Sequence, residues 1–190
     1  MKQMEEKILR EGVVLPGDIL KVGSFLNQNI DTQLLAEMGQ EIAHLYEGCG
    51  TTKILTIEAS GIAIAAAAGI AMGVPVLFAK KHKSSNVDGS VYSTIVHSFT
   101  HNEDYNVVVS KDYLSADDNV LLVDDFLANG KALRGLIDLC DQAGATLVGV
   151  AIAIEKCFTG AGDQLRAEGV RLESLAAIES MSEDAIVFRS

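Results

Sequence analysis

Two adjacent aspartates stand between an apolar run and a loop of small residues. Asp124 and Asp125 follow Leu121–Val123, and the segment Leu127–Ala132 (LANGKA) then opens a helical pattern. Free N–H groups and the helix dipole at such a helix start favour an anion, most simply a phosphate. Carboxylates in contact with a phosphate would repel it, so they make sense if their partners are instead hydroxyl groups, from which they accept hydrogen bonds. The stretch therefore predicts a site for a ribose 5-phosphate, and the alternative is a solvated acidic loop.

Better-known nucleotide motifs and metal motifs do not fit the chain. Gly130-Lys131 matches the end of a Walker A loop, but that loop needs Gly at position 125 and Ser or Thr at position 132. No G-x-G-x-x-G follows a predicted strand, so a dinucleotide-binding fold has no support. The histidines, at positions 44, 82, 97 and 101, show no metal-ligand spacing.

Two further segments could meet an anion. Glu58, Ala59, Ser60 and Gly61 end one predicted strand and start a helix, and their small residues allow close backbone approach. The segment 80–83 (KKHK) is the densest basic cluster in an acidic chain. The simpler interpretations are an ordinary strand-to-helix turn and a solvated loop.

The predicted elements alternate between strands and helices. Continuous apolar runs predict strands covered on both faces, as in a parallel sheet. Right-handed crossovers then give an open α/β sheet with its ligands at the carboxyl ends of the strands. We expect residues 1–47 to be helical with an irregular piece at 14–31, and 80–99 to be a polar loop leading into a hairpin. The predicted strands are 52–58, 75–80, 105–110, 119–125 and 145–155, and the predicted helices are 61–73, 130–143 and 161–168.

Composition narrows the class of protein. The chain has 190 residues, 48% of them hydrophobic, which suits one domain over 1–190. A net charge of -11 argues against a nucleic-acid partner. Three widely spaced cysteines and a charged start lead us to expect idle thiols, no secretory signal and a cytoplasmic location. The uncharged run 59–79 is long enough for a bilayer, but Pro75 divides it, so we expect a helix and a strand and no membrane partner.

The motifs together resemble a known family. "VLLVDDFLANGKA" (120–132) is similar to the phosphoribosyl-pyrophosphate signature of the type I phosphoribosyltransferases. The segments 11–31, "IEASGIA" (57–63), "FAKKHKS" (78–84) and "IAIEKCF" (152–158) follow in the order typical of the bacterial xanthine phosphoribosyltransferases. The resemblance covers nearly the whole chain. It implies the type I fold, with a hood formed by residues 1–47 and a flexible loop. It also implies the family's reaction, in which a purine nitrogen displaces pyrophosphate from C1 of the ribose.

The resemblance also implies roles for the two anion-binding segments. Asp124 and Asp125 would hold the ribose hydroxyls and stabilise charge on the sugar. Magnesium would be a cofactor held mainly by substrate, with no dedicated metal ligands in the protein. A mobile flap would bring Lys80 and Lys81 to the pyrophosphate, and in a homodimer it would serve the neighbouring site. The 5-phosphate would bind to Ala128, Asn129, Gly130, Lys131 and Ala132, and the pyrophosphate also to Glu58, Ala59, Ser60 and Gly61.

The purine pocket is assigned from the resemblance as well. Leu20, Asn27 and Lys156 would contact xanthine, with Phe25 lining the same hood; taken alone, Leu20 and Phe25 read as core and Lys156 as a solvated strand end. Some relatives carry an acid where this chain has Ala128, so no side chain of this loop is expected to act as a base.

The sequence leaves two rival functions open. One is transfer to another purine base, such as guanine, hypoxanthine or adenine. The other is a regulator that senses phosphoribosyl pyrophosphate and catalyses nothing. Such a regulator would need a DNA-binding domain and a basic surface, for which this acidic chain has no spare length.

Overall fold

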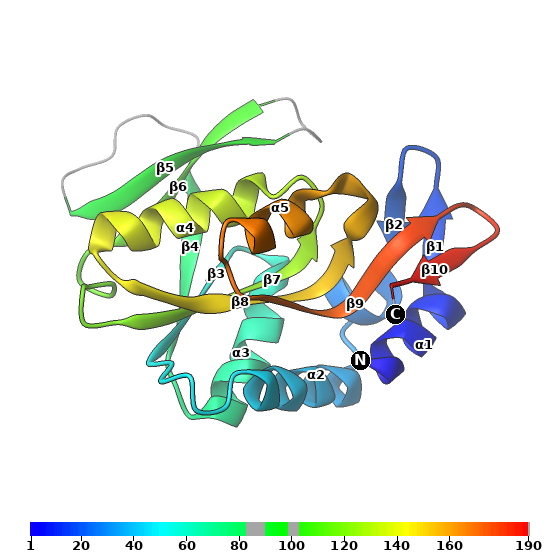
Figure 1. Ribbon diagram of the computed structural model, residues 1–190, viewed down its shortest axis with the longest axis horizontal. Coiled ribbons are helices and arrows are strands. Elements are labelled where there is room, and N and C mark those ends of the chain that lie inside the picture. The colour runs from blue at the N-terminus through cyan, green and yellow to red at the C-terminus, as the bar shows by residue number, and fades with distance from the viewer. Residues whose placement is uncertain (83–89, 99–102, 190) are drawn as a thin grey trace.

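The computed structural model describes residues 1–82, 90–98 and 103–189. Within these ranges one large sheet organises the molecule (Figure 1). Its strands are β3 (Lys53–Ile57), β4 (Val76–His82), β5 (Val91–Ser98), β6 (Glu103–Ser110), β7 (Asn119–Leu127), β8 (Thr146–Lys156), β9 (Leu172–Met181) and β10 (Ile186–Phe188).

The sheet is parallel at its centre and antiparallel at both edges. Among the described residues the strand order is β10-β9-β8-β7-β3-β4-β6-β5. The five strands from β9 to β4 run parallel to one another. The strands β10, β6 and β5 pair antiparallel. The predicted α/β fold with a central parallel sheet is confirmed.

Helices cover both faces of this sheet. α4 (Lys131–Ala143) and α5 (Ala161–Ala167) lie on one face, and α2 (Thr32–Leu45) and α3 (Ser60–Met72) lie on the other (Figure 1). Each face has its own buried core, and consecutive β7 residues alternate between the two cores. This double burial is the reason why the central strands are continuous apolar runs.

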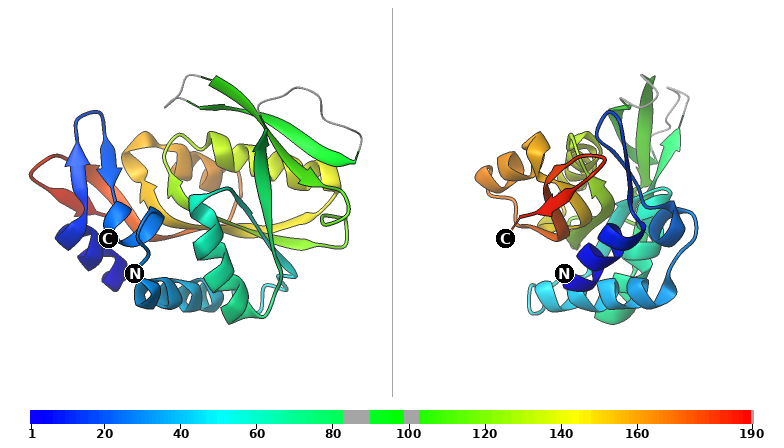
Figure 2. Two further views of the ribbon diagram at one scale, coloured as in Figure 1. Left: turned by 180° about the vertical axis from the view of Figure 1, so that it is seen from behind. Right: turned by 90° about the vertical axis from the view of Figure 1, so that its right-hand side faces the viewer.

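The hood, residues 1–47, stands at one end of the sheet except for α2, which extends beneath one face (Figure 2). It contains α1 (Lys2–Glu11), a hairpin of β1 (Val13–Leu15) and β2 (Ile19–Lys21), a π-helical turn at Gly23–Asn27, and α2. The expectation of an irregular piece at 14–31 was therefore wrong for the hairpin and the turn. Asp31 fixes the hood, because it accepts the Leu34 N–H at 3.1 Å and pairs with the Lys7 ammonium at 2.7 Å.

Residues 80–99 also differ from expectation. The hairpin is confirmed as β5 and β6. The strand predicted for 75–80 is confirmed as β4, but it continues through His82, so the loop predicted for Lys81 and His82 was wrong. β6 supplies an antiparallel partner beyond the point where β3 ends, pairing Lys80 with Val108 and Lys81 with Val107. The rest of the predicted flap, 83–89, lies outside the described residues. The uncharged run 59–79 divides into α3 and β4, and none of the described helices has the length and apolarity needed to cross a bilayer.

Candidate functional site

The two aspartates lie near the carboxyl end of the central strand β7. Asp124 is 6% exposed, and its Oδ1 accepts the Asp125 N–H at 2.9 Å. The Oδ1 of Asp125 accepts the Phe126 N–H at the same distance. The strand was expected to end at Asp125, but β7 continues to Leu127 because β8 pairs with it that far. Backbone hydrogen bonds thus hold both carboxylates at the end of the sheet where ligands bind.

The phosphate loop, Ala128–Ala132, joins β7 to α4. Gly130 adopts a left-handed conformation with φ 75°, which favours glycine, and it precedes α4 without a side-chain cap. The Asn129 side chain accepts the Lys131 N–H at 3.1 Å and so fixes the turn. Other N–H groups in the first turn have no acceptor within their own helix. The predicted loop and helix start are confirmed here, and both suit an anion.

The diphosphate turn, Glu58–Gly61, forms the start of α3. The Glu58–Ala59 peptide is cis, and Glu58 Oε1 accepts the Lys81 N–H at 2.6 Å. Gly61 packs against β7 so closely that a Cβ there would stand 3.0 Å from Asp124 Oδ1. The same Cβ would stand 2.2 Å from Thr56 Oγ1, a separation that real atoms do not show. Only glycine lets this helix start approach the aspartates.

These two helix starts share one pocket of about 210 Å³. The pocket brings together residues of β7, the diphosphate turn and β4, which are far apart in the sequence. Of the phosphate loop, Ala132 lines the pocket, whereas Ala128, Asn129, Gly130 and Lys131 are not among its lining residues. Its lining residues are Ile57, Glu58, Ala59, Ser60, Gly61, Lys81, Asp124, Asp125, Phe126 and Ala132.

Burial and charge compete inside this pocket. Burial raises the pKa of Asp124 well above its usual value, the negative charge of Asp125 raises it further, and Lys81 opposes both. The Lys81 ammonium lies 5.3 Å from the centre of the Tyr105 ring. Burial, aided by Asp124, raises the pKa of Tyr105. A pocket with two carboxylates, one ammonium and two helix starts can hold a hydroxylated, multiply phosphorylated ligand.

Comparison with known protein families identifies the family to which the chain and its pocket belong. The profile of the phosphoribosyl transferase domain matches residues 28–164, which include both helix starts and β7. The chain belongs to the phosphoribosyltransferase family. The xanthine phosphoribosyltransferase of Bifidobacterium adolescentis is 54% identical over 193 residues, covering all of both chains. That of Lactiplantibacillus plantarum is 51% identical over 191 residues, which cover 100% of this chain and 97% of the relative.

Solved structures agree on the fold of this phosphoribosyltransferase. The adenine phosphoribosyltransferase of Giardia lamblia, complexed with 9-deazaadenine, superimposes with a TM-score of 0.75, covering 90% of this chain and 96% of that one at 21% identity. That of Rhodothermus marinus gives a TM-score of 0.73 at 17% identity, with 92% and 98% covered. At this identity the likeness concerns the fold alone.

Of the two predicted flap lysines, the pocket includes one. Lys81 lines it, whereas Lys80 is not among its lining residues. Neighbouring residues of a strand point to opposite faces, and both lysines belong to β4. We therefore expect Lys81 to contribute more than Lys80 to ligand binding in the pocket of this phosphoribosyltransferase.

Lys81→Ala is expected to weaken binding of phosphoribosyl pyrophosphate by about 10-fold or more, because it removes the ammonium that faces the pocket. Lys80→Ala, the matched control, should weaken binding by less than about 3-fold, within the range of an exposed charge. Titration calorimetry of both variants with phosphoribosyl pyrophosphate measures this. A larger loss of affinity in Lys80→Ala than in Lys81→Ala would show that the alternation of side chains along β4 does not determine which lysine binds the ligand.

The residues predicted for the base are divided between two places. Leu20, 6% exposed, and Asn27 line a hollow of about 470 Å³ within the hood. Lys156 lies outside that hollow, and its ammonium donates to the Asp18 carbonyl at 2.7 Å. It stands 5.5 Å from the centre of the Phe126 ring, and burial lowers its pKa. Lys156 is thus at the boundary between the hood and the pocket, while Leu20 and Asn27 are on the hood side.

Sequence reasoning missed two aromatic residues of the site. Phe126 lines the pocket and faces Lys156, and its position directly after the aspartates was an available signal. Tyr105 comes from β6, and no local pattern indicated that it would lie beneath Lys81.

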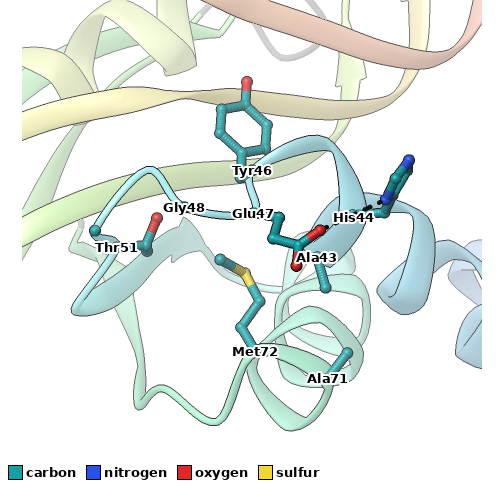
Figure 3. A pocket seen from close by; sticks show the side chains of 9 residues that line it. Ala43, His44, Tyr46, Glu47, Gly48, Thr51, Ala71 and Met72 are labelled. Atoms are coloured by element: carbon teal, nitrogen blue, oxygen red, sulfur yellow. Dashed lines mark ion pairs between the residues drawn. The ribbon is translucent and has the colours of Figure 1, made fainter.

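A second hollow lies away from these residues (Figure 3). It has a volume of about 460 Å³ and lies between the ends of α2 and α3, beside Thr51. An ion pair of 4.0 Å joins His44 and Glu47 at its edge. The Tyr46 hydroxyl points away from it and donates to the Val150 carbonyl at 2.7 Å. None of the candidate residues lines this hollow.

The pocket also fits a magnesium ion shared with substrate. Among residues 1–82, 90–98 and 103–189, no three His, Cys, Asp or Glu side chains gather around one point. Magnesium often takes only one or two carboxylates, with substrate phosphates and water filling its other positions. Asp124 and Asp125 supply oxygen donors of this kind on the pocket wall.

Proposed function

We propose that this chain transfers the 5-phosphoribosyl group from phosphoribosyl pyrophosphate to xanthine. Xanthosine 5'-monophosphate and pyrophosphate are the products, and the reaction salvages a purine base. The observation that carries the proposal is the pocket in which the diphosphate turn and the two aspartates meet Ala132 at the start of α4. Relatives named xanthine phosphoribosyltransferase, 54% and 51% identical along the whole chain, support the choice of base.

In the proposed reaction a purine nitrogen attacks C1 of the ribose, and the bond from C1 to pyrophosphate breaks. The phosphate loop holds the 5-phosphate, and the diphosphate turn with Lys81 receives the leaving pyrophosphate. Asp124 and Asp125 accept hydrogen bonds from the ribose hydroxyls. Their negative charge stabilises positive charge that develops on the sugar ring.

Magnesium is proposed as the cofactor that accompanies the diphosphate. When bound, it neutralises phosphate charge, and Asp124 and Asp125 are the residues placed to contact it directly or through water. Ala128 offers no acid or base in the phosphate loop. Because xanthine is itself fairly acidic, we propose that it arrives already deprotonated.

We propose that Lys156 selects the base. Its ammonium is only a donor, so it favours a carbonyl or enolate oxygen over an amino group. Xanthine has carbonyls at positions 2 and 6, whereas guanine and hypoxanthine have one at position 6 only. Of the three donors of this ammonium, one is bonded to the Asp18 carbonyl. A base that lacks the matched oxygen leaves a further donor of a partly buried ammonium without an acceptor, which discriminates between bases. Leu20 and Asn27 in the hood are proposed to close the other side of the base.

The function is tested by pyrophosphate release with each base at matched concentration. Xanthine is expected to react fastest, guanine and hypoxanthine well behind, and adenine undetectably. Lys156→Ala should shrink the gap between xanthine and guanine, mainly by harming xanthine. Lys111→Ala is the matched control, because Lys111 lies 5.4 Å from the Tyr92 ring centre in a similar contact elsewhere.

The rival functions give different results in the same assay. Equal rates with guanine or hypoxanthine would make the chain a transferase for another 6-oxopurine. Binding of phosphoribosyl pyrophosphate without release of pyrophosphate for any base would favour the regulator.

We also propose a homodimer. α3 is apolar around its whole circumference, and Ile70 on it is 84% exposed. An apolar hollow of about 560 Å³ lies beside it, lined by residues of α2 and α3. Exposed apolar surface of this kind marks an interface, and a second copy of the chain presents the same apolar face for a symmetric contact.

The dimer is tested by light scattering of the unmodified chain and of Ile70→Glu. The unmodified chain is expected at twice the monomer mass, and Ile70→Glu should shift it toward the monomer, because a buried carboxylate opposes association. A monomeric unmodified chain would contradict the proposal.

A further inference from the structure

Thr159 contacts both the phosphate loop and the backbone of Lys156 through its side chain. It ends the turn of 3-10 helix at Cys157–Thr159, which directly follows β8. Its Oγ1 lies 2.6 Å from the Ala128 carbonyl oxygen of the phosphate loop. The same atom lies 2.8 Å from the carbonyl oxygen of Lys156. One side chain therefore links the loop assigned to the 5-phosphate with the residue assigned to the base.

The chemistry of this contact makes the hydroxyl indispensable to it. A carbonyl oxygen only accepts hydrogen bonds, so both contacts depend on the single proton of Thr159. The Lys156 contact spans three residues and closes a local turn. The Ala128 contact spans 31 residues and is tertiary. Loss of the hydroxyl would leave the Ala128 carbonyl without this donor, and the phosphate loop without this attachment to the turn that follows β8.

The surrounding segment is built as a rigid support for the loop. A Cβ on Gly130 would stand 3.3 Å from the Cβ of Ala161, so the phosphate loop lies directly against the start of α5. α5 is fixed in turn by Arg166, whose guanidinium donates to the two oxygens of Glu155 at 2.8 and 2.7 Å. Glu155 is fully buried and also accepts from Ser174 Oγ at 2.5 Å. This anchored segment gives Thr159 a fixed position from which to hold the loop.

We propose that Thr159 is a positioning residue for the phosphate loop. It touches neither the reacting atoms nor the base, and acts by keeping the loop N–H groups aligned with the 5-phosphate. The inference rests on the proposed function only for the identity of the phosphorylated ligand. It assigns a role to a residue outside the signature 120–132 and outside the pocket lining.

The test compares Thr159→Val, Thr159→Ser and the matched control Thr52→Val. Valine keeps the shape of threonine and removes the hydroxyl, whereas serine keeps the hydroxyl. Thr52 is also exposed, and its Oγ1 accepts the Asn119 N–H at 2.8 Å at the opposite end of β7. Calorimetry gives the Kd for ribose 5-phosphate, and steady-state kinetics gives KM for phosphoribosyl pyrophosphate and for xanthine.

Thr159→Val is expected to raise the Kd for ribose 5-phosphate and the KM for phosphoribosyl pyrophosphate by about 10-fold, or about 1.4 kcal/mol. In the same variant the KM for xanthine should change less than about 2-fold. For Thr159→Ser all three constants should stay within about 3-fold of those of the unmodified chain. Thr52→Val should leave all three constants unchanged. Unchanged ribose 5-phosphate binding in Thr159→Val, or an equal loss in Thr159→Ser, would overturn the proposal.

The ribose 5-phosphate measurement separates this inference from the proposed function. It requires no base and no catalysis, so a chain that proves inactive with xanthine still tests Thr159. If Thr159→Val does not fold, as judged by circular dichroism, Thr159→Ala and the serine variant supply the same comparison.

Discussion

Replacing Asp124 and Asp125 together with asparagine is expected to lower turnover by well over an order of magnitude. Asparagine has nearly the same shape and can still accept the Asp125 and Phe126 N–H groups that the carboxylates accept now. It carries no charge, so the stabilisation of positive charge on the reacting sugar is lost. The measurement is kcat for pyrophosphate release at saturating substrates.

The double variant should remain folded for a reason visible in the structure. The pKa of Asp124 is raised because burial disfavours its charged form, so ionised Asp124 costs stability as pH rises through that pKa. Asparagine removes this cost, and thermal unfolding near neutral pH should show a stability equal to or above that of the unmodified chain. Asp112 and Asp117, both exposed, provide a control pair for asparagine substitution. Near-normal turnover by the folded variant would refute the assignment of the aspartates.

Gly61→Ala is expected to damage both stability and activity. The added Cβ would stand 2.2 Å from Thr56 Oγ1 and 3.0 Å from Asp124 Oδ1, so the start of α3 or the end of β7 must move. Overpacking of this kind costs about 1–3 kcal/mol. Because the displaced atoms belong to the diphosphate turn and to an aspartate proposed to be catalytic, kcat/KM for phosphoribosyl pyrophosphate should fall by about 100-fold.

A second substitution tests the cause of this damage. Thr56→Ala removes the atom closest to the new Cβ, and within the described residues Thr56 Oγ1 is buried without a hydrogen-bond partner. The double variant should therefore regain part of the lost stability and activity, with a coupling energy of about 0.5–3 kcal/mol in a double-mutant cycle. Chemical denaturation and initial rates of all four proteins give this energy. Simple additivity would mean that the clash with Thr56 is not the cause.

Much of the fold was predictable because burial leaves a regular trace in the sequence. Strands covered on both faces must be apolar without interruption, and β3, β7 and β8 were found on that basis. β9 was missed because Glu173 and Ser174 interrupt its apolar residues. Ser174 donates to the buried Glu155, a partner that the neighbouring strand supplies and that no local pattern indicates.

The sequence by itself determined the local chemistry of the site. Two helix starts after buried strands, and two carboxylates before one of them, are properties of short segments such as 58–61 and 124–132. Their meeting at one edge also followed, because parallel strands place their carboxyl ends together. The antiparallel pairing of β4 with β6, however, is a long-range contact, and it decided that Lys81 lines the pocket while Lys80 does not.

Only the tertiary structure decided which distant residues support this chemistry. Tyr105 beneath Lys81, Phe126 against Lys156, and Thr159 against Ala128 are contacts between segments whose local patterns do not depend on one another. The physical reason is that periodicity records which face of an element is buried, not which side chain of another element will cover it. That choice depends on packing and hydrogen bonding across the whole sheet, which exist only once the chain has folded.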